Sequence, residues 1–435
     1  FKLILLLIFT PCALFSQSYD YYFSGDTSDI ITSPTYGICL MGGASENDQG
    51  AEWFLNKADG GNILVLRTSG ADGYQNYFYN ALGVPVQSVE TIVLNNSTAA
   101  SDPFVLRRIE NAEAIWLAGG DQYLYELYFK NSSIKTLLNN HINVKSAPIG
   151  GTSAGMAILG EFYFNAQNGT ITSTEALNNP YDQSLTVESN FISTPILENT
   201  ITDTHYDNPD RKGRHITFIA RMQENDPNMD YFGIASDEFV AICIDENGIA
   251  TVYGEHPDFE DNAYFLRTNC VRTIPSVLQN NTPLTWMGSD PAIFSCNVKG
   301  TTDGLNQFDL NTWLDLKGGE WEGWSVNQGT LLIDQIQHTG CTTSTDNLDS
   351  EHDNTTIYPN PTADIIMIES DKDIINIELF DINGQFLMSK QNINFISLKN
   401  FEKGIYQLRV TKRNHDTLIR KVVRLSLIHI SEPTR

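Results

Sequence analysis

A serine between glycines is the strongest candidate for chemistry in this chain. Ser153 is central in the pentapeptide Gly151-Thr152-Ser153-Ala154-Gly155, after a mostly apolar run at 144–149 and before the apolar run 156–159. This order predicts a strand, a sharp turn and a helix, in which the serine hydroxyl projects outward as a nucleophile. The first amides of the helix would face the negative charge that develops in acyl transfer. An ordinary glycine-rich turn is the alternative interpretation.

An acyl-transfer serine needs a general base and an acid that orients it. Among eight histidines, His205 stands out because it lies in a polar run, Asp203-Thr204-His205-Tyr206. The pair Asp237-Glu238 precedes a strand-like run and can supply the acid. Downstream of His205, Arg211-Lys212-Gly213-Arg214 places three positive charges in an acidic chain, which indicates a site for a substrate carboxylate. A solvated helix start is the simpler explanation of that basic cluster.

The segments around these residues predict an α/β fold. Strand-like runs at 36–41, 63–66, 88–94 and 114–117 alternate with helix-like segments at 46–58, 74–82, 102–112 and 124–138. Such alternation indicates a parallel sheet flanked by helices, whose ligands bind beyond the carboxyl ends of the strands. Glycine turns are expected at that rim, at Gly42-Gly43, Ser69-Gly70, Gly119-Gly120 and Gly150-Gly151. Tight loops without a binding role are the alternative explanation.

The balance of acidic and basic residues along the chain changes near residue 345. Residues 1–345 hold 40 acidic and 16 basic side chains, whereas residues 346–425 hold 12 and 10. We therefore expect a first domain at 17–285, a small β-rich extension at 286–340, a polar linker at 341–356 and a small β-sandwich at 357–425. Residues 426–435 are typical of a translated sequencing adapter, and we expect an artefactual tail there.

The ends and the charge of the chain bear on its location and partners. Lys2 precedes an apolar run from Leu3 to Phe15, which predicts a secretory signal peptide at 1–16 and an exported protein. A formal charge of −26 argues against nucleic acid as a partner.

The cysteines show no zinc spacing, so we expect neither a metal nor another cofactor. Cys39 and Cys243 lie in apolar runs and are predicted to be buried thiols. One disulfide is expected among Cys270, Cys296 and Cys341, with the pairing left open.

Three motifs together resemble those of the cyanophycinase and dipeptidase E family of serine peptidases. They are Gly119-Gly120-Asp121-Gln122, Gly150 to Gly155, and Asp203 to Tyr206, in this order. The resemblance runs from about residue 35 to 275. It implies a fold similar to class I glutamine amidotransferases, which is flavodoxin-like, and cleavage of peptide or β-aspartyl peptide bonds.

The same resemblance implies a role for each site residue. Ser153 would be the nucleophile, His205 the general base and Glu238 the carboxylate that orients it. The amides of Gly120 and Ala154 would form the oxyanion hole. The residues that would hold the peptide substrate are Gln122, Asp203, Arg211 and Arg214.

Four departures from the family pattern concern substrate choice. Tyr206 replaces a phenylalanine, Thr204 a glutamine and Pro209 the first of three arginines, while Glu126 stands where lysine is usual. The catalytic set is intact, so the departures bear on which peptide is cleaved.

Two further function classes stay open. An α/β-hydrolase esterase shares the pentapeptide, but it runs serine, acid, histidine in chain order, so His256 or His338 would be its base. The altered substrate residues also permit a non-catalytic surface binding protein. Formation of a homodimer is also left open by the sequence.

The C-terminal region resembles a sorting domain of the type IX secretion system of Bacteroidetes. The matching segments are Tyr358-Pro359-Asn360-Pro361-Thr362, Leu379-Phe380-Asp381 with Asn383-Gly384, and Gly404-Ile405-Tyr406. The resemblance implies the type IX machinery as a partner, and export across the outer membrane followed by release or surface attachment.

Overall fold

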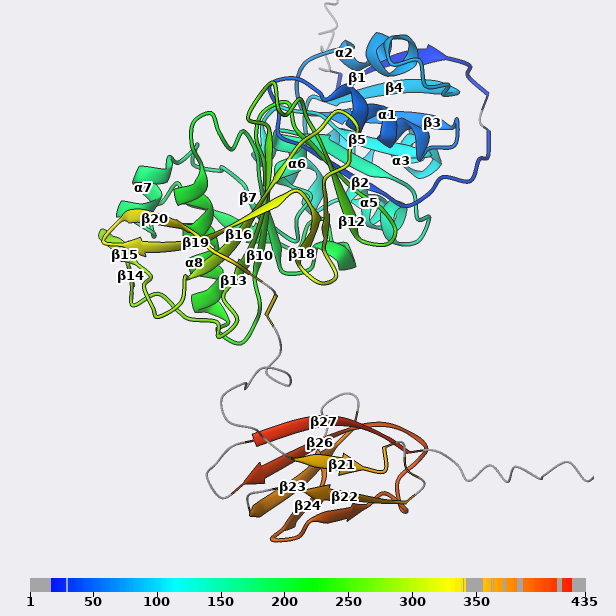
Figure 1. Ribbon diagram of the computed structural model, residues 1–435. Coiled ribbons are helices and arrows are strands. Elements are labelled where there is room, and N and C mark those ends of the chain that lie inside the picture. The colour runs from blue at the N-terminus through cyan, green and yellow to red at the C-terminus, as the bar shows by residue number, and fades with distance from the viewer. Residues whose placement is uncertain are drawn as a thin grey trace, which may run out of the picture. The chain divides into compact units, whose positions relative to one another are not determined.

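The computed structural model forms two compact units, one ending at Gly340 and one starting at Cys341 (Figure 1). It describes residues 17–341 and 355–424, except 29, 339, 361, 363, 371–372, 382–385 and 413–416. The expected signal peptide, most of the expected linker and the expected tail lie outside the described residues. No helix in the described part is both long and apolar enough to cross a membrane.

The core of the first unit is a ten-stranded sheet. Its central strands are parallel in the order β4 (Ser88–Leu94), β3 (Asn62–Arg67), β5 (Ala114–Leu117), β6 (Ile149–Thr152), β2 (Ile38–Met41). The antiparallel strands at its two ends are β1 (Tyr19–Gly25) beside β4, and β11 (Ala241–Ile244), β12 (Ile249–Tyr253), β17 (Gln307–Asp309) and β18 (Leu314–Lys317) beyond β2.

Both faces of this sheet are covered, which explains why its central strands are buried along almost their whole length. Cys39 and Met41 face the core beneath α1 (Asp48–Asn56), α2 (Gly73–Asn76) and the π-helix η1 (Tyr77–Ala81). Ile38 and Leu40 face the opposite core, to which α3 (Pro103–Asn111) and α5 (Ser133–Asn143) contribute. The predicted α/β class, a parallel sheet flanked by helices, is confirmed.

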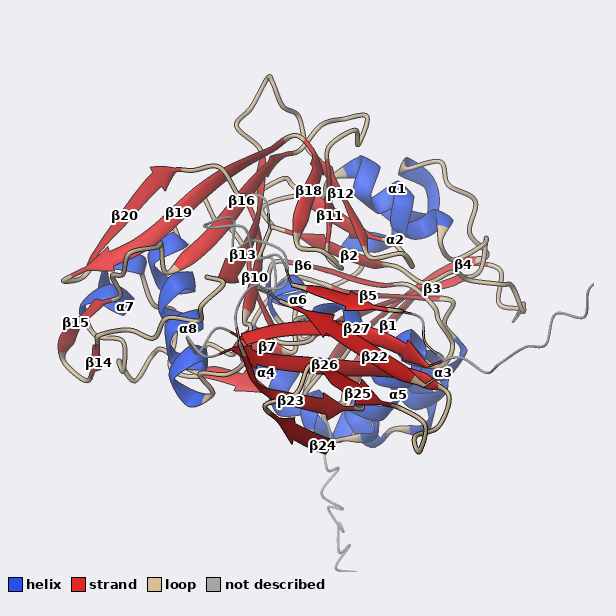
Figure 2. Cartoon of the chain, turned by 60° about the horizontal axis from the view of Figure 1, so that its bottom comes forward, coloured by secondary structure: helices blue, strands red, loops and turns tan. Residues whose placement is uncertain are grey.

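A second, eight-stranded sheet shares that opposite core. Its strands run in the order β20 (Thr330–Gln335), β19 (Gly319–Asn327), β16 (Ile293–Lys299), β13 (Asn262–Thr268), β10 (Phe232–Ser236), β9 (Thr200–Asp203), β7 (Phe162–Phe164), β8 (Val187–Ser189). Its other face packs on α7 (Ser173–Asn178) and α8 (Lys212–Asn225), which lie together in Figures 1 and 2. The hairpin β14 (Val277–Gln279) and β15 (Thr282–Thr285) forms a separate two-stranded sheet, which packs on the same core as α7 and α8.

The β-rich segment at 286–340 is built into both sheets. Strands β17 and β18 extend the first sheet, whereas β16, β19 and β20 extend the second. The segment therefore completes the layers that begin earlier in the chain.

Two local predictions were wrong. The helix expected at 124–138 is divided into α4 (Gln122–Tyr125) with the π-helix η3 (Glu126–Lys130), and α5, because Ser132 caps α5 by accepting the Ile134 amide at 3.2 Å. The strand before the serine covers 149–152, not 144–149, so Gly150 and Gly151 lie within it. A side chain at Gly150 would come within 2.5 Å of the Trp116 ring, which explains a glycine inside a strand.

The second unit contains two antiparallel sheets with one core. The first sheet has β21 (Thr356–Tyr358), β22 (Ile365–Glu369) and β25 (Phe395–Ser397). The second has β24 (Phe386–Gln391), β23 (Ile374–Phe380), β26 (Gly404–Lys412) and β27 (Thr417–Arg424). Ile366 from the first sheet and Leu408 from the second lie in the same buried cluster, which confirms the predicted β-sandwich. The expected turn at Asn383-Gly384 lies outside the described residues.

Each cysteine among the described residues is either a buried free thiol or disulfide-bonded. Cys39 and Cys243 are opposite each other on β2 and β11, buried and free, with their sulfurs 3.8 Å apart. Cys270 and Cys341 are both disulfide-bonded, whereas Cys296 is a buried free thiol.

Candidate active site

Ser153 lies in a strained turn between β6 and the short helix α6 (Ala154–Ala157). Its φ of 51° and ψ of −116° are rare for a residue with a side chain, and such strain is common where a side chain must be presented for function. The turn packs directly against β5, since a Cβ at Gly155 would come within 1.9 Å of the Leu117 carbonyl oxygen. The sharp turn predicted from the pentapeptide is therefore present.

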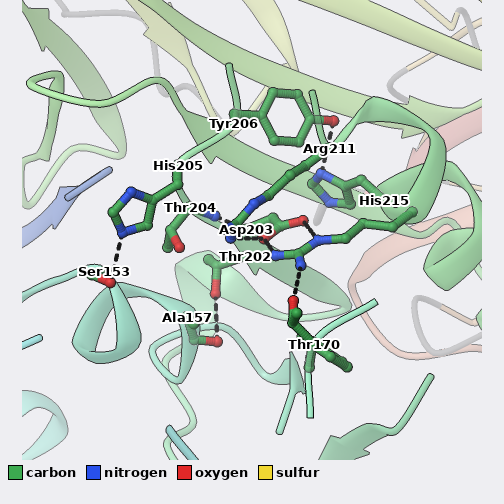
Figure 3. A network of polar contacts seen from close by, with 12 residues as sticks. Ser153, Ala157, Thr170, Thr202, Asp203, Thr204, His205, Tyr206, Arg211 and His215 are labelled. Carbon is green, nitrogen blue, oxygen red and sulfur yellow. Dashed lines mark hydrogen bonds and ion pairs between the residues drawn. The ribbon is translucent and has the colours of Figure 1, made fainter. Parts of the chain in front are cut away.

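His205 is the hydrogen-bonding partner of Ser153. Its Nε2 lies 2.8 Å from the Ser153 hydroxyl oxygen, and Figure 3 shows the imidazole directed at the serine. His205 follows β9, and its amide donates to the Gly42 carbonyl at 2.9 Å, which fixes the loop against the end of β2. A Cβ at Gly43 would come within 2.4 Å of His205 Nε2, so glycine at that position leaves room for the ring.

Glu238 completes the row of hydrogen bonds. Its Oε1 lies 2.6 Å from His205 Nδ1, so Nδ1 carries a proton and Nε2 is free to accept the serine proton. Burial raises the pKa of Glu238, but hydrogen bonds from His205 and Asn208 outweigh it and hold that pKa below its ordinary value. Glu238 is thus a carboxylate at neutral pH, and it stabilises a positive charge on His205.

A cleft of about 480 Å³ opens beside Ser153 and His205. Its remaining walls are Gly43, Ala44, Ser45, Glu46, Arg67, Gly73, Tyr74, Tyr77, Gly119 and Thr152. Glu46, Arg67 and Tyr74 were not among the site residues predicted from the sequence. One signal was available, because Arg67 directly follows the predicted strand at 63–66 and lies two residues before the predicted Ser69-Gly70 turn.

The predicted oxyanion amides belong to segments that flank the serine. Ala154 follows Ser153 and begins α6, so its amide has no acceptor within the helix. Gly119 lies against the serine, since a Cβ there would be 3.5 Å from the Ser153 Cβ. Gly120 lies in the turn after β5 and has a φ of +150°, a backbone conformation that favours glycine.

Asp203 and Arg214, predicted to hold substrate, are buried instead in an ion pair with each other. Arg214 Nε donates to Asp203 Oδ2 at 2.9 Å, and both residues are only 2% exposed. Burial raises the pKa of Asp203, but the Arg214 guanidinium outweighs it and the net pKa falls. Neither residue lines the cleft, and this placement favours support of the adjacent His205 loop over substrate contact.

Arg211 and Gln122 are more accessible. Arg211 Nη1 is 3.9 Å from Asp203 Oδ1, and its buried Nε has no hydrogen-bond acceptor among the described residues. Its charge also contributes to lowering the pKa of Glu238, so it lies close to the row of catalytic candidates. Gln122 donates to the Phe164 carbonyl at 3.3 Å. The expected helix start at the basic cluster is observed, because α8 begins at Lys212.

His256 and His338, the histidines that an esterase would use, make contacts that differ from those of His205. His338 packs between Phe294 and Trp321, with ring centroids 4.3 and 4.4 Å away, and burial lowers its pKa to about 4. His256 follows β12 and donates its backbone amide to Gly300 at 2.9 Å. The serine hydroxyl is instead bonded to His205.

The fold and this site define an α/β protein with a hydrogen-bonded serine, histidine and glutamate at the rim of its parallel sheet. The chain is 26% identical over 171 residues to cyanophycinases from Synechococcus elongatus and from Thermosynechococcus vestitus. The match covers 39% of this chain and 48% of either relative, so the chain spans about half the length of the curated relatives it matches.

Two other matches concern the C-terminal unit and the fold. Residues 356–424 match the family model described as a secretion system C-terminal sorting domain. A solved structure of a peptidase from an acI-B1 Actinobacterium aligns with a TM-score of 0.38 and 15% identity, covering 51% of this chain and 89% of that one. The two resemblances indicated by the motifs, to cyanophycinases and to the sorting domain, are confirmed.

Proposed function

We propose that this chain is a secreted serine peptidase that hydrolyses peptide or β-aspartyl peptide bonds through an acyl-enzyme on Ser153. The observation that carries the proposal is the continuous row of hydrogen bonds from Ser153 through His205 to Glu238, beside an open cleft. The similarity to cyanophycinases supports the same class of reaction.

The proposed reaction follows from these contacts. His205 Nε2 takes the hydroxyl proton while the Ser153 oxygen attacks the scissile carbonyl carbon. The amides of Gly120 and Ala154 stabilise the oxyanion, and Glu238 stabilises the imidazolium. The carbon–nitrogen bond then breaks as His205 gives its proton to the leaving amine. A water molecule, deprotonated by His205, releases the acyl group from the serine.

The two alternatives receive less support. An esterase of the α/β-hydrolase kind needs an acid and then a histidine after the serine, whereas here the bonded histidine precedes the bonded acid. A non-catalytic binding protein is permitted by Thr204, Pro209 and Glu126, but it would not need the strained serine or its bonded partners.

In this proposal, the C-terminal unit leads to export of the protein. The matched sorting domain supports passage through the type IX secretion machinery to the cell surface or the medium. Deleting residues 356–424 should leave the protein inside cells of a type IX-competent host, and unchanged export of that deletion would contradict this part.

The peptidase proposal is tested with the full chain. It should be incubated with cyanophycin, β-aspartyl dipeptides, α-aspartyl dipeptides and a p-nitrophenyl ester, and the products identified by mass. We expect peptide cleavage that is lost in His205→Ala and retained in His256→Ala and His338→Ala. Ester cleavage alone, with His256 or His338 essential, would overturn the proposal in favour of the esterase.

A further inference from the structure

Cys39 and Cys243 lie directly opposite each other on the neighbouring strands β2 and β11. Both are buried, and the Cys243 thiol donates a hydrogen bond to the Cys39 sulfur, with the two sulfurs 3.8 Å apart. A single buried cysteine usually acts as a small apolar side chain and needs no further explanation. Two thiols in contact form a dithiol, which can also close to a disulfide.

The register of the two strands suits such a bond. The Gly42 amide donates to the Val240 carbonyl at 3.1 Å, so these opposite residues are a hydrogen-bonded pair of the antiparallel ladder. Hydrogen-bonded pairs alternate along the strands with pairs that share no backbone hydrogen bond, and Cys39 and Cys243 are therefore a pair of the second kind. The Cα atoms of such a pair are about 4.5 Å apart, within the range of about 4.4–6.8 Å that disulfides span. The strands need not move apart or together for the bond to form.

The same two strands lead into the segments that hold the candidate base and its acid. The Gly42 carbonyl, directly after β2, accepts the His205 amide at 2.9 Å. The Gly43 carbonyl accepts the amide of Phe239, the residue between Glu238 and the start of β11, at 3.1 Å. A covalent bond between β2 and β11 would therefore keep these two segments from separating.

Helix α1 covers the two thiols. The Cys39 thiol donates to the Gly50 carbonyl of α1 at 3.7 Å, and the Cys243 sulfur lies 4.0 Å from the same oxygen. Burial, and then the hydrogen bond with Cys39, raise the pKa of the Cys243 thiol well above its ordinary value. Since the thiolate is the form that attacks a disulfide, exchange needs α1 to move aside or takes place while the chain folds.

We propose that Cys39 and Cys243 are a redox site, at which a cross-strand disulfide closes and joins β2 to β11. One thiolate attacks an external disulfide, that of a small thiol or of a thiol oxidase, and forms a mixed disulfide with it. The second thiol then loses its proton and displaces the remaining external thiol. The pair gives up two electrons and two protons, and the external disulfide becomes two thiols. Oxidising surroundings are those that the proposed export would provide, whereas the bond itself does not depend on the peptidase function.

Simple packing is the competing explanation, in which the two cysteines are only small side chains of the core. The chain contains two internal references that separate these explanations. Cys296 is a buried free thiol, whereas Cys270 and Cys341 are disulfide-bonded. Packing alone predicts that Cys39 and Cys243 remain thiols, like Cys296, under conditions in which Cys270 and Cys341 are oxidised.

The test starts from the full chain, reduced with dithiothreitol and then freed of it. The protein is incubated with glutathione disulfide in urea below the unfolding midpoint, where local opening exposes buried groups. Incubation continues until Cys270 and Cys341 have lost their thiols. The remaining thiols are alkylated after denaturation in acid, and the peptides are identified by mass. We expect a peptide pair joined through Cys39 and Cys243, together with alkylated Cys296.

Thermal melting measures whether the bond joins the strands in the folded protein. The bond closes a loop of about 200 residues, so it strongly restricts the unfolded chain, and the oxidised wild type should melt about 5 °C or more above the reduced one. Because reduction also opens the bonds of Cys270 and Cys341, the same shift is measured in two variants. It should be smaller by that amount in Cys243→Ala and unchanged in the matched control, Cys296→Ala.

Two results would overturn the proposal. One is the recovery of Cys39 and Cys243 as alkylated thiols, or bonded to glutathione or Cys296 instead of to each other. The other is an equal oxidation shift in the wild type and Cys243→Ala, which would mean that the bond does not hold β2 to β11. Neither readout uses peptide cleavage, so a protein that cleaves no peptide would refute the proposed function and leave this proposal standing.

Discussion

Asp203 and Arg214 form a buried ion pair that joins the two ends of the loop that carries His205. Asp203 ends β9 and Arg214 lies in the first turn of α8, so the pair joins the strand before the candidate base to the helix after it. Arg214 also donates to the Ile171 carbonyl at 3.3 Å. Two of the residues predicted to touch substrate are thus placed where they can support the loop that carries His205.

Replacing Arg214 by Met should mainly destabilise the fold. Removing one member of a buried ion pair leaves an uncompensated charge and costs about 3–5 kcal/mol of unfolding free energy. Arg211→Met is the matched variant, and because Arg211 is partly exposed it should change stability little and raise KM. Urea unfolding and steady-state kinetics measure both. A stable Arg214→Met protein with only a raised KM would restore Arg214 as a substrate ligand.

Glu238→Gln should lower kcat by about 10²–10⁴-fold and leave KM nearly unchanged. The amide keeps the size of the side chain but loses the negative charge that stabilises the His205 imidazolium and selects its tautomer. Steady-state kinetics on a cleaved dipeptide measure the effect. A kcat within twofold of the wild type would exclude Glu238 as the orienting acid.

The raised pKa of Asp237 predicts that the stability of the fold depends on pH. It accepts hydrogen bonds from the amide and side chain of Asn262, at 3.1 and 2.9 Å, yet burial raises its pKa to about 7. A pKa above the unfolded value means that the folded state binds the proton more tightly, so stability is greatest at low pH and falls as pH rises through about 7. Relative to Asp237→Asn, the wild type should lose on the order of 2 kcal/mol between pH 5 and 8. A stability difference that is constant over this range would show that Asp237 does not titrate there.

Gly155→Ala should prevent the serine turn from packing correctly. Its Cβ would come within 1.9 Å of a backbone oxygen, which cannot move aside as a flexible side chain can, and overpacking of this kind costs about 1–3 kcal/mol or more. Gly119→Ala is the control, since its Cβ would meet only ordinary contacts, the nearest at 3.5 Å. Thermal melting compares the two, and equal melting temperatures would contradict the tight packing of the turn.

Local sequence was sufficient wherever one short segment determined the structure. The strands β4 and β5 were predicted to the residue, because each is a short run rich in strand-forming residues that is bounded by polar or turn residues. Ser153 and His205 stood out because each lies in a short run with a recognisable composition, whereas Glu238 was chosen over Asp237 by the family resemblance. The structure brings all three residues together.

Pairings between distant segments could not be predicted in this way. Glu46, Arg67 and Tyr74 line one cleft because β2 and β3 are parallel strands of one sheet and end at the same edge, and nothing within each segment shows that arrangement. The burial of Arg214 depends likewise on Asp203, eleven positions earlier. Gly150 was taken for a turn residue because the Trp116 ring that requires it lies on a neighbouring strand.

The most direct test of the account is turnover by Ser153→Ala beside a matched control, Ser97→Ala, which removes an exposed serine hydroxyl at the start of the 3-10 helix η2 (Ser97–Ser101). Both variants should fold, and kcat is measured on the peptide that the wild type cleaves best. The account predicts that Ser153→Ala loses at least about 10³-fold in kcat while Ser97→Ala matches the wild type. Peptide cleavage by Ser153→Ala at the wild-type rate would contradict it.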